Sequence, residues 1–479
     1  MNELDPLRWK ALTVVAAAFV MTVIDLSIVN VALPSIGKAL NFSQANLQWV
    51  ITAYAIAYGG FVLLGGRLAD TLGRRRVFLT GVGVFTLASF FCGIAWTDTV
   101  LIASRAVQGL SAAVIAPAAL SIVMTTFPEG SERNRAMGVW GAIGGSGAAI
   151  GVLLGGVLTR YLGWEWIFFV NLPIGALVLV IAPRFVREGR SDEKVSLDLA
   201  GATTVTAGLA LLVYAISKAP DNGWASTTTI SFLAAAAAFL VAFVAIELRV
   251  KHPLVPFRIF RVGNVLGADL TALFVGAVIF GNFFLLTLYT QQVLRWSALR
   301  AGLAFVAIAG AGMVFAGIAQ ALVTRLGPKS VLTAGMLAMT GGMVWLSQIP
   351  VHSSYWSNLL PGYLLVGIAM PLSFIPLSIA ATTGVERNEA GLASGLWGTA
   401  QQIGGAVGVA VVSSVWLSHF TALMKQNGPR SFPESFTSGV QLAFWVCAGI
   451  AAAGLVVTLA LVHRTDAKPA TEAAEAVAR

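Results

Sequence analysis

Residues 67–79 read RLADTLGRRRVFL, and residues 321–333 read ALVTRLGPKSVLT, with leucine, glycine, basic and valine positions in common at an offset of 254. A second pair of stretches shares this offset: RNRAMGVWG at 133–141 and RNEAGLASG at 387–395. Two separate junctions with the same period indicate that the chain contains two copies of one structural unit. The composition of the segments between them indicates what that unit is.

These segments are apolar. Of the 479 residues, 57% are hydrophobic and 11% are charged, and the mean hydropathy is +0.83. A soluble chain of this length needs more charge to cover its surface. Apolar runs of about 20 residues recur throughout, and each is long enough to cross a hydrocarbon core of roughly 30 Å. The sequence therefore predicts an all-α polytopic membrane protein that lies in the lipid bilayer.

We predict fourteen membrane-spanning helices. A six-helix unit needs only about 180–200 residues, so the 254-residue offset leaves room for an inserted pair of helices. The predicted domains are an N-terminal six-helix bundle at 1–190, a linker with two inserted helices at 191–255, a C-terminal six-helix bundle at 256–465 and a disordered cytoplasmic tail at 466–479. The helices are expected near 11–36, 47–69, 77–96, 99–126, 135–159, 164–185, 198–217, 228–248, 263–290, 299–323, 329–349, 356–382, 391–418 and 437–463.

The basic residues predict the orientation in the membrane. If the N-terminus is inside, 22 of the 30 Lys and Arg residues fall on the inner side, 7 on the outer side, and Arg105 lies within a span. Cytoplasmic loops carry an excess of Lys and Arg, so both termini are expected in the cytoplasm. Orientation thus explains the net charge of +9, and we expect no nucleic-acid partner. Because Cys92 and Cys447 lie in apolar segments, neither a disulfide framework nor a metal site is expected.

Five stretches carry recognisable motifs: DLSIVNVALPSI (25–36), GRLADTLGRRRVFL (66–79), LIASRAVQGLSAA (101–113), GAAIGVLLGG (147–156) and WIFFVNLPIG (166–175). With them the chain resembles, over nearly its whole length, the major facilitator superfamily and specifically its fourteen-helix drug/proton antiporter family. It departs from the family pattern at Val152, where proline is usual, and at Glu165, where arginine is usual.

This resemblance implies the major facilitator fold, with two six-helix bundles and two inserted helices, in a bacterial cytoplasmic (inner) membrane. It implies multidrug efflux: proton-coupled antiport of hydrophobic or cationic drugs by alternating access, by a monomer, driven by the proton gradient without a cofactor. The alternative is a dedicated proton-coupled exporter of one endogenous metabolite, such as an antibiotic, a siderophore or a lipid precursor.

Two further classes are weighed against these. The motifs in the first and fifth predicted helices, at 25–36 and 147–156, argue against solute uptake by symport. A membrane-embedded enzyme or receptor would need a catalytic constellation or a sizeable soluble domain, and the sequence offers neither. It also contains no Walker loop, so an ATP-driven pump is not expected.

Asp25 stands in the middle of the apolar run FVMTVIDLSIVNVALP, residues 19–34. Acids within a membrane span are costly and usually mark an ion path. Low dielectric favours the neutral acid and a nearby cation favours the carboxylate, which makes Asp25 a candidate proton carrier; the alternative is a static acid that packs the bundle. By the resemblance, Arg105 faces the same cavity, where it is expected to pair with Asp25 or with backbone carbonyls and to tune the proton affinity. The alternative is a structural clamp that holds the fourth helix in register.

Asp269 is the second acid within a span and the only one in the C-terminal half. It is a candidate for a second proton site or for an anchor for cationic drugs. A third interpretation is that Asp269 lies at the membrane interface and its side chain snorkels to the cytoplasm. The depth of Asp269 in the membrane decides between these interpretations.

The loop between the second and third helices contains Gly66, Asp70, Gly73, Arg74 and Arg75. The glycines permit a tight turn, and a helix N-terminus favours an acid such as Asp70. The resemblance implies a latch that joins the two halves on the cytoplasmic side when the cavity opens outward. The positive-inside rule alone explains the arginines but not Asp70 or the glycines.

The fifth helix carries the motif glycines Gly147, Gly151, Gly155 and Gly156. Gly141, Gly144, Gly147, Gly151 and Gly155 are three or four residues apart and therefore share a helix face, so these five form a smooth stripe for close helix contact. The stripe is expected either to pack helices or, more specifically, to seal the interface between the halves against proton leak.

Candidate substrate-binding residues are aromatic or polar and lie within spans that should border the cavity. Aromatic faces attract lipophilic cations, although most aromatic residues in membrane proteins serve packing or interfacial belts. The candidates are Tyr54, Tyr58, Trp140, Phe283, Phe284, Tyr289, Trp397, Gln401 and Gln402.

Overall fold

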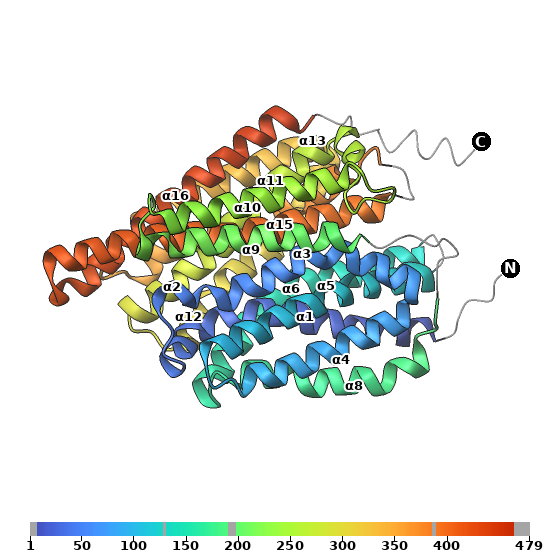
Figure 1. Ribbon diagram of the computed structural model, residues 1–479, viewed down its shortest axis with the longest axis horizontal. Coiled ribbons are helices and arrows are strands. Elements are labelled where there is room, and N and C mark those ends of the chain that lie inside the picture. Colours follow the sequence, from blue (N-terminus) through green and yellow to red (C-terminus); the bar gives the residue numbers. More distant parts are fainter. Residues whose placement is uncertain (1–6, 128–130, 190–197, 386–388, 464–479) are drawn as a thin grey trace.

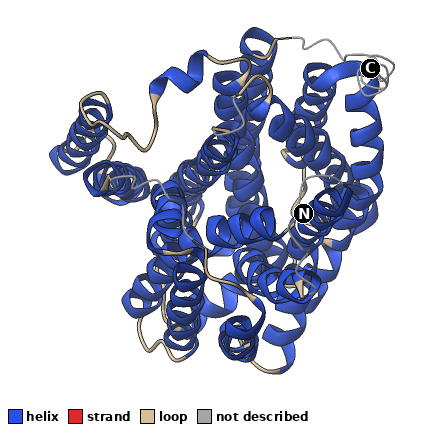
Figure 2. Cartoon of the chain, turned by 90° about the vertical axis from the view of Figure 1, so that its right-hand side faces the viewer, coloured by secondary structure: helices blue, strands red, loops and turns tan. Residues whose placement is uncertain are grey.

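The computed structural model describes residues 7–127, 131–189, 198–385 and 389–463, and these ranges contain helices and no strand (Figures 1 and 2). The predicted all-α class is confirmed. The long helices run side by side (Figure 1). We call the end at which α1 begins and α16 ends the terminal end, and the opposite end the far end. Figure 2 looks onto the terminal end.

The first part of the chain forms the helices of the N-terminal half and the inserted pair. They are α1 (Arg8–Ala39), α2 (Gln44–Leu47), α3 (Trp49–Leu72), α4 (Arg74–Gly93), α5 (Asp98–Thr126), α6 (Ser131–Tyr161), α7 (Trp166–Phe169), α8 (Asn171–Phe185), α9 (Leu199–Asn222) and α10 (Thr227–Glu247).

The remainder forms the C-terminal half. Its elements are η1 (Phe257–Arg261), α11 (Val265–Leu288), η2 (Tyr289–Val293), α12 (Ala298–Ala304), α13 (Val306–Leu346), η3 (Tyr355–Leu359), α14 (Leu360–Thr382), α15 (Ala390–Asn427), η4 (Pro429–Ser431) and α16 (Phe432–Leu461).

Twelve helices in the described residues are long and apolar enough to cross a membrane. Two segments differ from the predicted list. The stretch Ala298–Leu346 counts as one helix of 49 residues, although Gly327 within it has a non-helical backbone. In the described part of α6, Ile150–Tyr161 is a shorter apolar helix. The count of fourteen spans and the predicted domain boundaries therefore stay predictions.

The internal repeat is visible in the backbone. Gly73 ends α3 with φ of 107°, and Gly327, its counterpart at the same offset of 254, interrupts α13 with φ of 77°. Side chains other than hydrogen are strained at such angles. The two glycines therefore allow the same sharp turn at the terminal end of both halves, which explains why glycine stands at both positions.

Helix pairs recur as well. In the N-terminal half α1 packs on α6 and α4 on α5; in the C-terminal half α11 packs on α15 and α13 on α14. The inserted helices α9 and α10 pack on each other, and α9 also lies against α3 and α15, one helix from each half (Figure 1).

Among the described residues the two halves meet mainly where α3 packs on α15, α6 on α12 and on α13, and α1 on α11. Several of these contacts lie toward the far end. The Gln291 Nε2 atom donates a hydrogen bond of 2.8 Å to the Val31 carbonyl, which joins η2 to α1. Ser413 of α15 donates its hydroxyl hydrogen bond to the Gln48 side chain beside α3.

Candidate functional site

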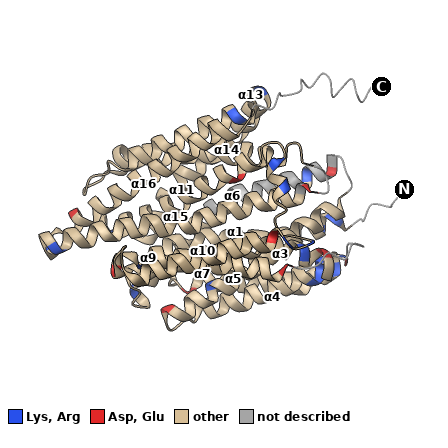
Figure 3. Cartoon of the chain, turned by 45° about the horizontal axis from the view of Figure 1, so that its top comes forward, with Lys and Arg blue, Asp and Glu red and all other residues tan. Residues whose placement is uncertain are grey.

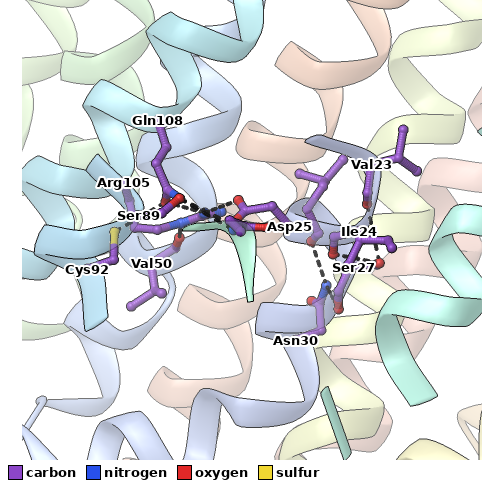
Figure 4. Close-up of polar contacts among 12 residues, drawn as sticks. Val23, Ile24, Asp25, Ser27, Asn30, Val50, Ser89, Cys92, Arg105 and Gln108 are labelled. Atoms are coloured by element: carbon purple, nitrogen blue, oxygen red, sulfur yellow. Dashed lines mark hydrogen bonds and ion pairs between the residues drawn. The ribbon is translucent and has the colours of Figure 1, made fainter. Parts of the chain in front are cut away.

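A buried polar cluster surrounds Asp25 in the N-terminal half (Figure 4). One carboxylate oxygen of Asp25 forms an ion pair with Arg105 Nη1. The other accepts hydrogen bonds from Asn171 Nδ2 at 2.9 Å and Gln108 Nε2 at 3.1 Å. Gln108 also donates to the Ser89 hydroxyl at 2.7 Å. Four helices, α1, α4, α5 and α8, thus place polar side chains around one carboxylate.

Arg105 is itself held on several sides. Its Nε donates to the Val50 carbonyl at 2.9 Å, and Nη1 donates to Gln108 Oε1 at 2.8 Å. The guanidinium carbon lies 4.5 Å from the centre of the Tyr54 ring and 5.9 Å from that of Phe168. Cation–π attraction of this kind is strongest where water is excluded. The cation thus keeps partners besides Asp25.

The contact proposed from the sequence between Asp25 and Arg105 is therefore present. Both residues are 0% exposed, so the pair lies inside the N-terminal half and faces no open cavity in this structure. Sequence reasoning did not identify Ser89, Gln108 and Asn171. Gln108 and Asn171 stand within two of the quoted motifs, and their polarity in apolar helices was the available signal.

Three glycines of α6 pack against the stretch of α1 that carries Asp25. A Cβ atom at Gly147 would lie 2.7 Å from Val23 Cγ1, one at Gly151 2.9 Å from the Ile24 carbonyl, and one at Gly155 2.6 Å from the Ile28 carbonyl. Such close backbone approach needs small residues. The larger part of the predicted stripe therefore packs inside the N-terminal half.

Gly156 lies at the other interface. A Cβ there would lie 3.0 Å from the Ala298 carbonyl of α12, and a Cβ at Gly302 would lie 3.0 Å from the Val152 carbonyl of α6. Of the four motif glycines, Gly156 thus contacts the opposite half. The predicted seal of the glycine stripe between the halves stays a prediction.

The acid and the arginines at 70–76 make their polar contacts within the N-terminal half, whereas Arg67 of the same motif donates hydrogen bonds to the His252 and Pro253 carbonyls, which follow α10. Asp70 pairs with Arg74 at 3.1 Å. Glu188, which follows α8, accepts a hydrogen bond of 3.1 Å from the Arg75 backbone and lies 3.8 Å from its guanidinium. Gly66 packs against Pro117 of α5. Sequence reasoning missed Glu188. The latch between the halves stays a prediction, because Asp70 and Arg74–Arg76 contact only their own half in the described residues.

Asp269 lies near the terminal end of α11 and is 7% exposed. Both carboxylate oxygens are buried, and neither has a hydrogen-bond partner among the described residues. A side chain that snorkels to the aqueous phase would expose its oxygens, so the snorkelling interpretation is wrong. The other two interpretations remain.

The predicted substrate residues contact different partners in the structure. Tyr54 lies under Arg105, and Tyr58 stacks on Tyr54 with 6.2 Å between ring centres. Tyr289 donates its hydroxyl to Ser353 at 2.6 Å. Three further aromatic candidates each pack on another ring: Trp140 on Phe19, Phe283 on Phe305 and Trp397 on Phe374. Phe284 is buried in the core. The Gln401 carbonyl packs on Gly276.

Two of the surface cavities in the described part of the chain lie in the C-terminal half, toward the far end. One is lined by Ser347, Gln348, His419, Ser438, Gln441, Leu442 and Trp445, and the other by residues around Trp345 and Asn358. Neither contains a predicted substrate residue, so the substrate site stays a prediction.

Comparisons with known proteins agree on the class. The sequence model of the Major Facilitator Superfamily matches residues 15–409. The chain is 37% identical to the puromycin resistance protein pur8 of Streptomyces alboniger, over 98% of this chain and 94% of that protein. It is 40% identical to the cephamycin export protein CmcT of Amycolatopsis lactamdurans, over 85% of this chain and 84% of that protein.

Among solved structures, a bacterial homologue of the human lysosomal transporter Spinster, in an inward-facing and unoccupied conformation, superposes with a TM-score of 0.69. The match covers 95% of this chain and 96% of that one at 16% identity. At this identity the likeness shows the fold alone.

Proposed function

The chain belongs to the Major Facilitator Superfamily, and on that premise we propose that it exports hydrophobic or cationic drugs in exchange for protons. It is a multi-pass membrane transporter and not an enzyme. The proposal places it in a bacterial cytoplasmic membrane, where it works by alternating access as a monomer that needs no cofactor beyond the proton gradient.

The observation that carries the proposal is the buried pair of Asp25 and Arg105. In the ion-paired state the two charges cancel inside a low-dielectric interior. A proton on Asp25 removes that cancellation, but Arg105 keeps the Val50 carbonyl and Gln108 Oε1 as acceptors. Arg105 thus has hydrogen-bond acceptors besides Asp25, which supports a role of Asp25 in binding and releasing a proton.

The packing of α6 on α1 supports a coupling role. Backbone contacts at Gly151 and Gly155 begin one residue before Asp25 and end three residues after it. A change in the Asp25–Arg105 pair that shifts α1 must therefore shift α6, whose far-end residue Gly156 contacts the opposite half. This is a continuous physical path from the carboxylate to the interface between the halves.

Orientation follows from charge. Lys and Arg gather near the terminal end, with few at the far end (Figure 3). The excess of basic residues on cytoplasmic loops supports a cytoplasmic terminal end with both chain termini inside.

A dedicated exporter of one endogenous metabolite is the second candidate. It is favoured by the relatives, since the names of the two proteins described above each refer to a single antibiotic, puromycin or cephamycin. Substrate breadth separates the two candidates: a drug exporter moves chemically unrelated compounds, and a dedicated exporter moves one.

The test is ethidium transport in proteoliposomes under an imposed pH gradient. The wild type is expected to accumulate ethidium against its concentration gradient, and Asp25→Asn is expected to lose this while still exchanging ethidium without a pH gradient. Asp221→Asn, at an exposed position of α9, is the matched control. Gradient-driven accumulation by Asp25→Asn would contradict the role of Asp25. Wild-type transport that does not depend on the pH gradient would contradict proton antiport.

A further inference from the structure

Asp25 and Asp269, the two acids that the sequence predicts within membrane spans, are held in opposite ways. Asp25 accepts from Arg105, Gln108 and Asn171, so its charge is balanced by the protein. Asp269 is almost as deeply buried, at 7% exposed, yet both of its oxygens lack a hydrogen-bond partner, and no ion pair with it is present in the described part of the chain. An ionised carboxylate in an apolar interior is very costly without a partner.

The face of α11 that carries Asp269 packs on α15. Leu273 and Gly276 follow Asp269 by four and seven residues, which places all three on one helix face. A Cβ at Gly276 would lie 2.0 Å from the Gln401 carbonyl, and the Leu273 carbonyl would lie 1.9 Å from a Cβ at Gly404. Asp269 therefore stands on the α15 side of its helix, one to two turns nearer the terminal end than these contacts.

Trp397 lies on the face of α15 that packs on α11, at about the level of Asp269. It precedes Gln401 and Gly404 by four and seven residues, so it shares their face and lies one to two turns nearer the terminal end. Its indole Nε1 is buried without a hydrogen-bond partner. Its ring meets Phe374 of α14 edge-on at 6.3 Å between ring centres. Helix periodicity thus brings a carboxylate and two aromatic rings from three helices to one level.

We propose that Asp269 is the anchor for the positive charge of a lipophilic organic cation, and that Trp397 and Phe374 supply the aromatic surface for its ring system. A delocalised cation gives the carboxylate the partner that the protein lacks, and it gains cation–π attraction from the neighbouring rings. An apolar cation suits this site because it needs few hydrogen bonds. The assignment deepens the proposed export function, on which its physiological meaning rests, and it makes positive charge a determinant of the substrate.

The test is binding of ethidium, a lipophilic cation, to the purified full-length protein in detergent, followed by ethidium fluorescence. Nile red serves as a neutral lipophilic probe. Asp269→Asn is expected to raise the Kd for ethidium about tenfold or more, which corresponds to about 1.4 kcal/mol, and to leave the Kd for Nile red within about twofold. Asp269→Glu is expected to restore most of the ethidium affinity, and Asp221→Asn to change neither value.

Three results would overturn the assignment: no ethidium binding by the wild type, unchanged ethidium affinity in Asp269→Asn, or an equal loss for both probes. Gel filtration and thermal melting in the same detergent identify a variant that does not fold. If Asp269→Asn does not fold, the comparison of Asp269→Glu with the wild type decides. We then expect Asp269→Glu to keep the preference for ethidium over Nile red. Binding does not require a proton gradient. Ethidium binding that depends on Asp269, together with no gradient-driven transport in proteoliposomes, would therefore refute the proposed function and leave the anchor standing.

Discussion

Gly73 and Gly327 occupy the same turn in the two halves of the protein: they lie 254 residues apart, and both have positive φ, 107° and 77°. Since most side chains avoid this backbone region, neither position accepts another residue without strain. The relationship shows that the sequence repeat is a repeat of backbone geometry.

Alanine at either glycine is expected to destabilise the protein by about 1–2 kcal/mol, the cost of a Cβ in a left-handed conformation. The measurement is thermal unfolding in detergent by tryptophan fluorescence, with Gly449→Ala as control, because a Cβ at Gly449 meets nothing within 4 Å. Gly73→Ala and Gly327→Ala should both melt below the wild type. Equal melting temperatures for all four proteins would contradict the strained turns.

The ion pair of Asp25 and Arg105 predicts a strong energetic coupling. Asp25→Asn leaves a buried cation without its counter-charge, and Arg105→Gln leaves a buried carboxylate with only neutral donors. Each single change is expected to cost about 3–5 kcal/mol. The double variant should be more stable than the sum of the single effects predicts, with a coupling of about 0.5–3 kcal/mol.

Thermal unfolding of the wild type, the two single variants and the double variant gives this cycle directly. A second cycle with Asp221→Asn in place of Asp25→Asn is the control, because Asp221 is exposed in α9. Strictly additive effects in the first cycle would mean that the pair contributes nothing beyond its separate hydrogen bonds.

Part of this site could be predicted because charged residues within a membrane are few. With one arginine clearly inside a span and one acid in the N-terminal spans, the pairing of Asp25 with Arg105 was the simplest arrangement. Ser89, Gln108 and Asn171 are neutral, and many neutral polar residues occur in the spans, so only the rotation of each helix decides which of them reach Asp25. That rotation depends on packing across several helices.

The glycine stripe shows the same limit. Spacing of three or four residues identified a face of α6 that approaches another helix closely, but it did not say which one. The structure places Gly147, Gly151 and Gly155 against α1 and Gly156 against α12. Neighbouring residues on one helix thus serve two different interfaces, a difference of one helix position that composition does not reveal.

Substitution of Gly151 tests whether close packing of α6 on α1 matters for transport. Valine there would bring a Cβ to 2.9 Å from the Ile24 carbonyl and onto the Ser27 hydroxyl, and it would push away the segment that carries Asp25. Overpacking of a close contact costs about 1–3 kcal/mol of stability. Because this strain falls on the segment that carries Asp25, we expect gradient-driven ethidium transport to fall about tenfold or more.

The matched control is Gly310→Val, since a Cβ at Gly310 of α13 meets nothing within 4 Å. Transport rates are compared per folded protein in proteoliposomes. If Gly151→Val transports as well as Gly310→Val, the stripe is a packing feature without consequence for coupling.

The contact between Gly156 and Gly302 predicts that the halves can be locked together at the far end. A Cβ on Gly302 would lie 3.4 Å from the Gly156 Cα, which is compatible with the Cα separation of about 4.4–6.8 Å found in disulfides. Cysteines at both positions should cross-link on mild oxidation, while the native Cys92 and Cys447 are buried. Alternating access requires the far end to open, so we expect the cross-linked protein to be inactive in transport. Reduction of the disulfide should restore transport. Gly156→Cys alone, oxidised in the same way, controls for the side chain, and full transport by the cross-linked protein would show that this contact does not open during the cycle.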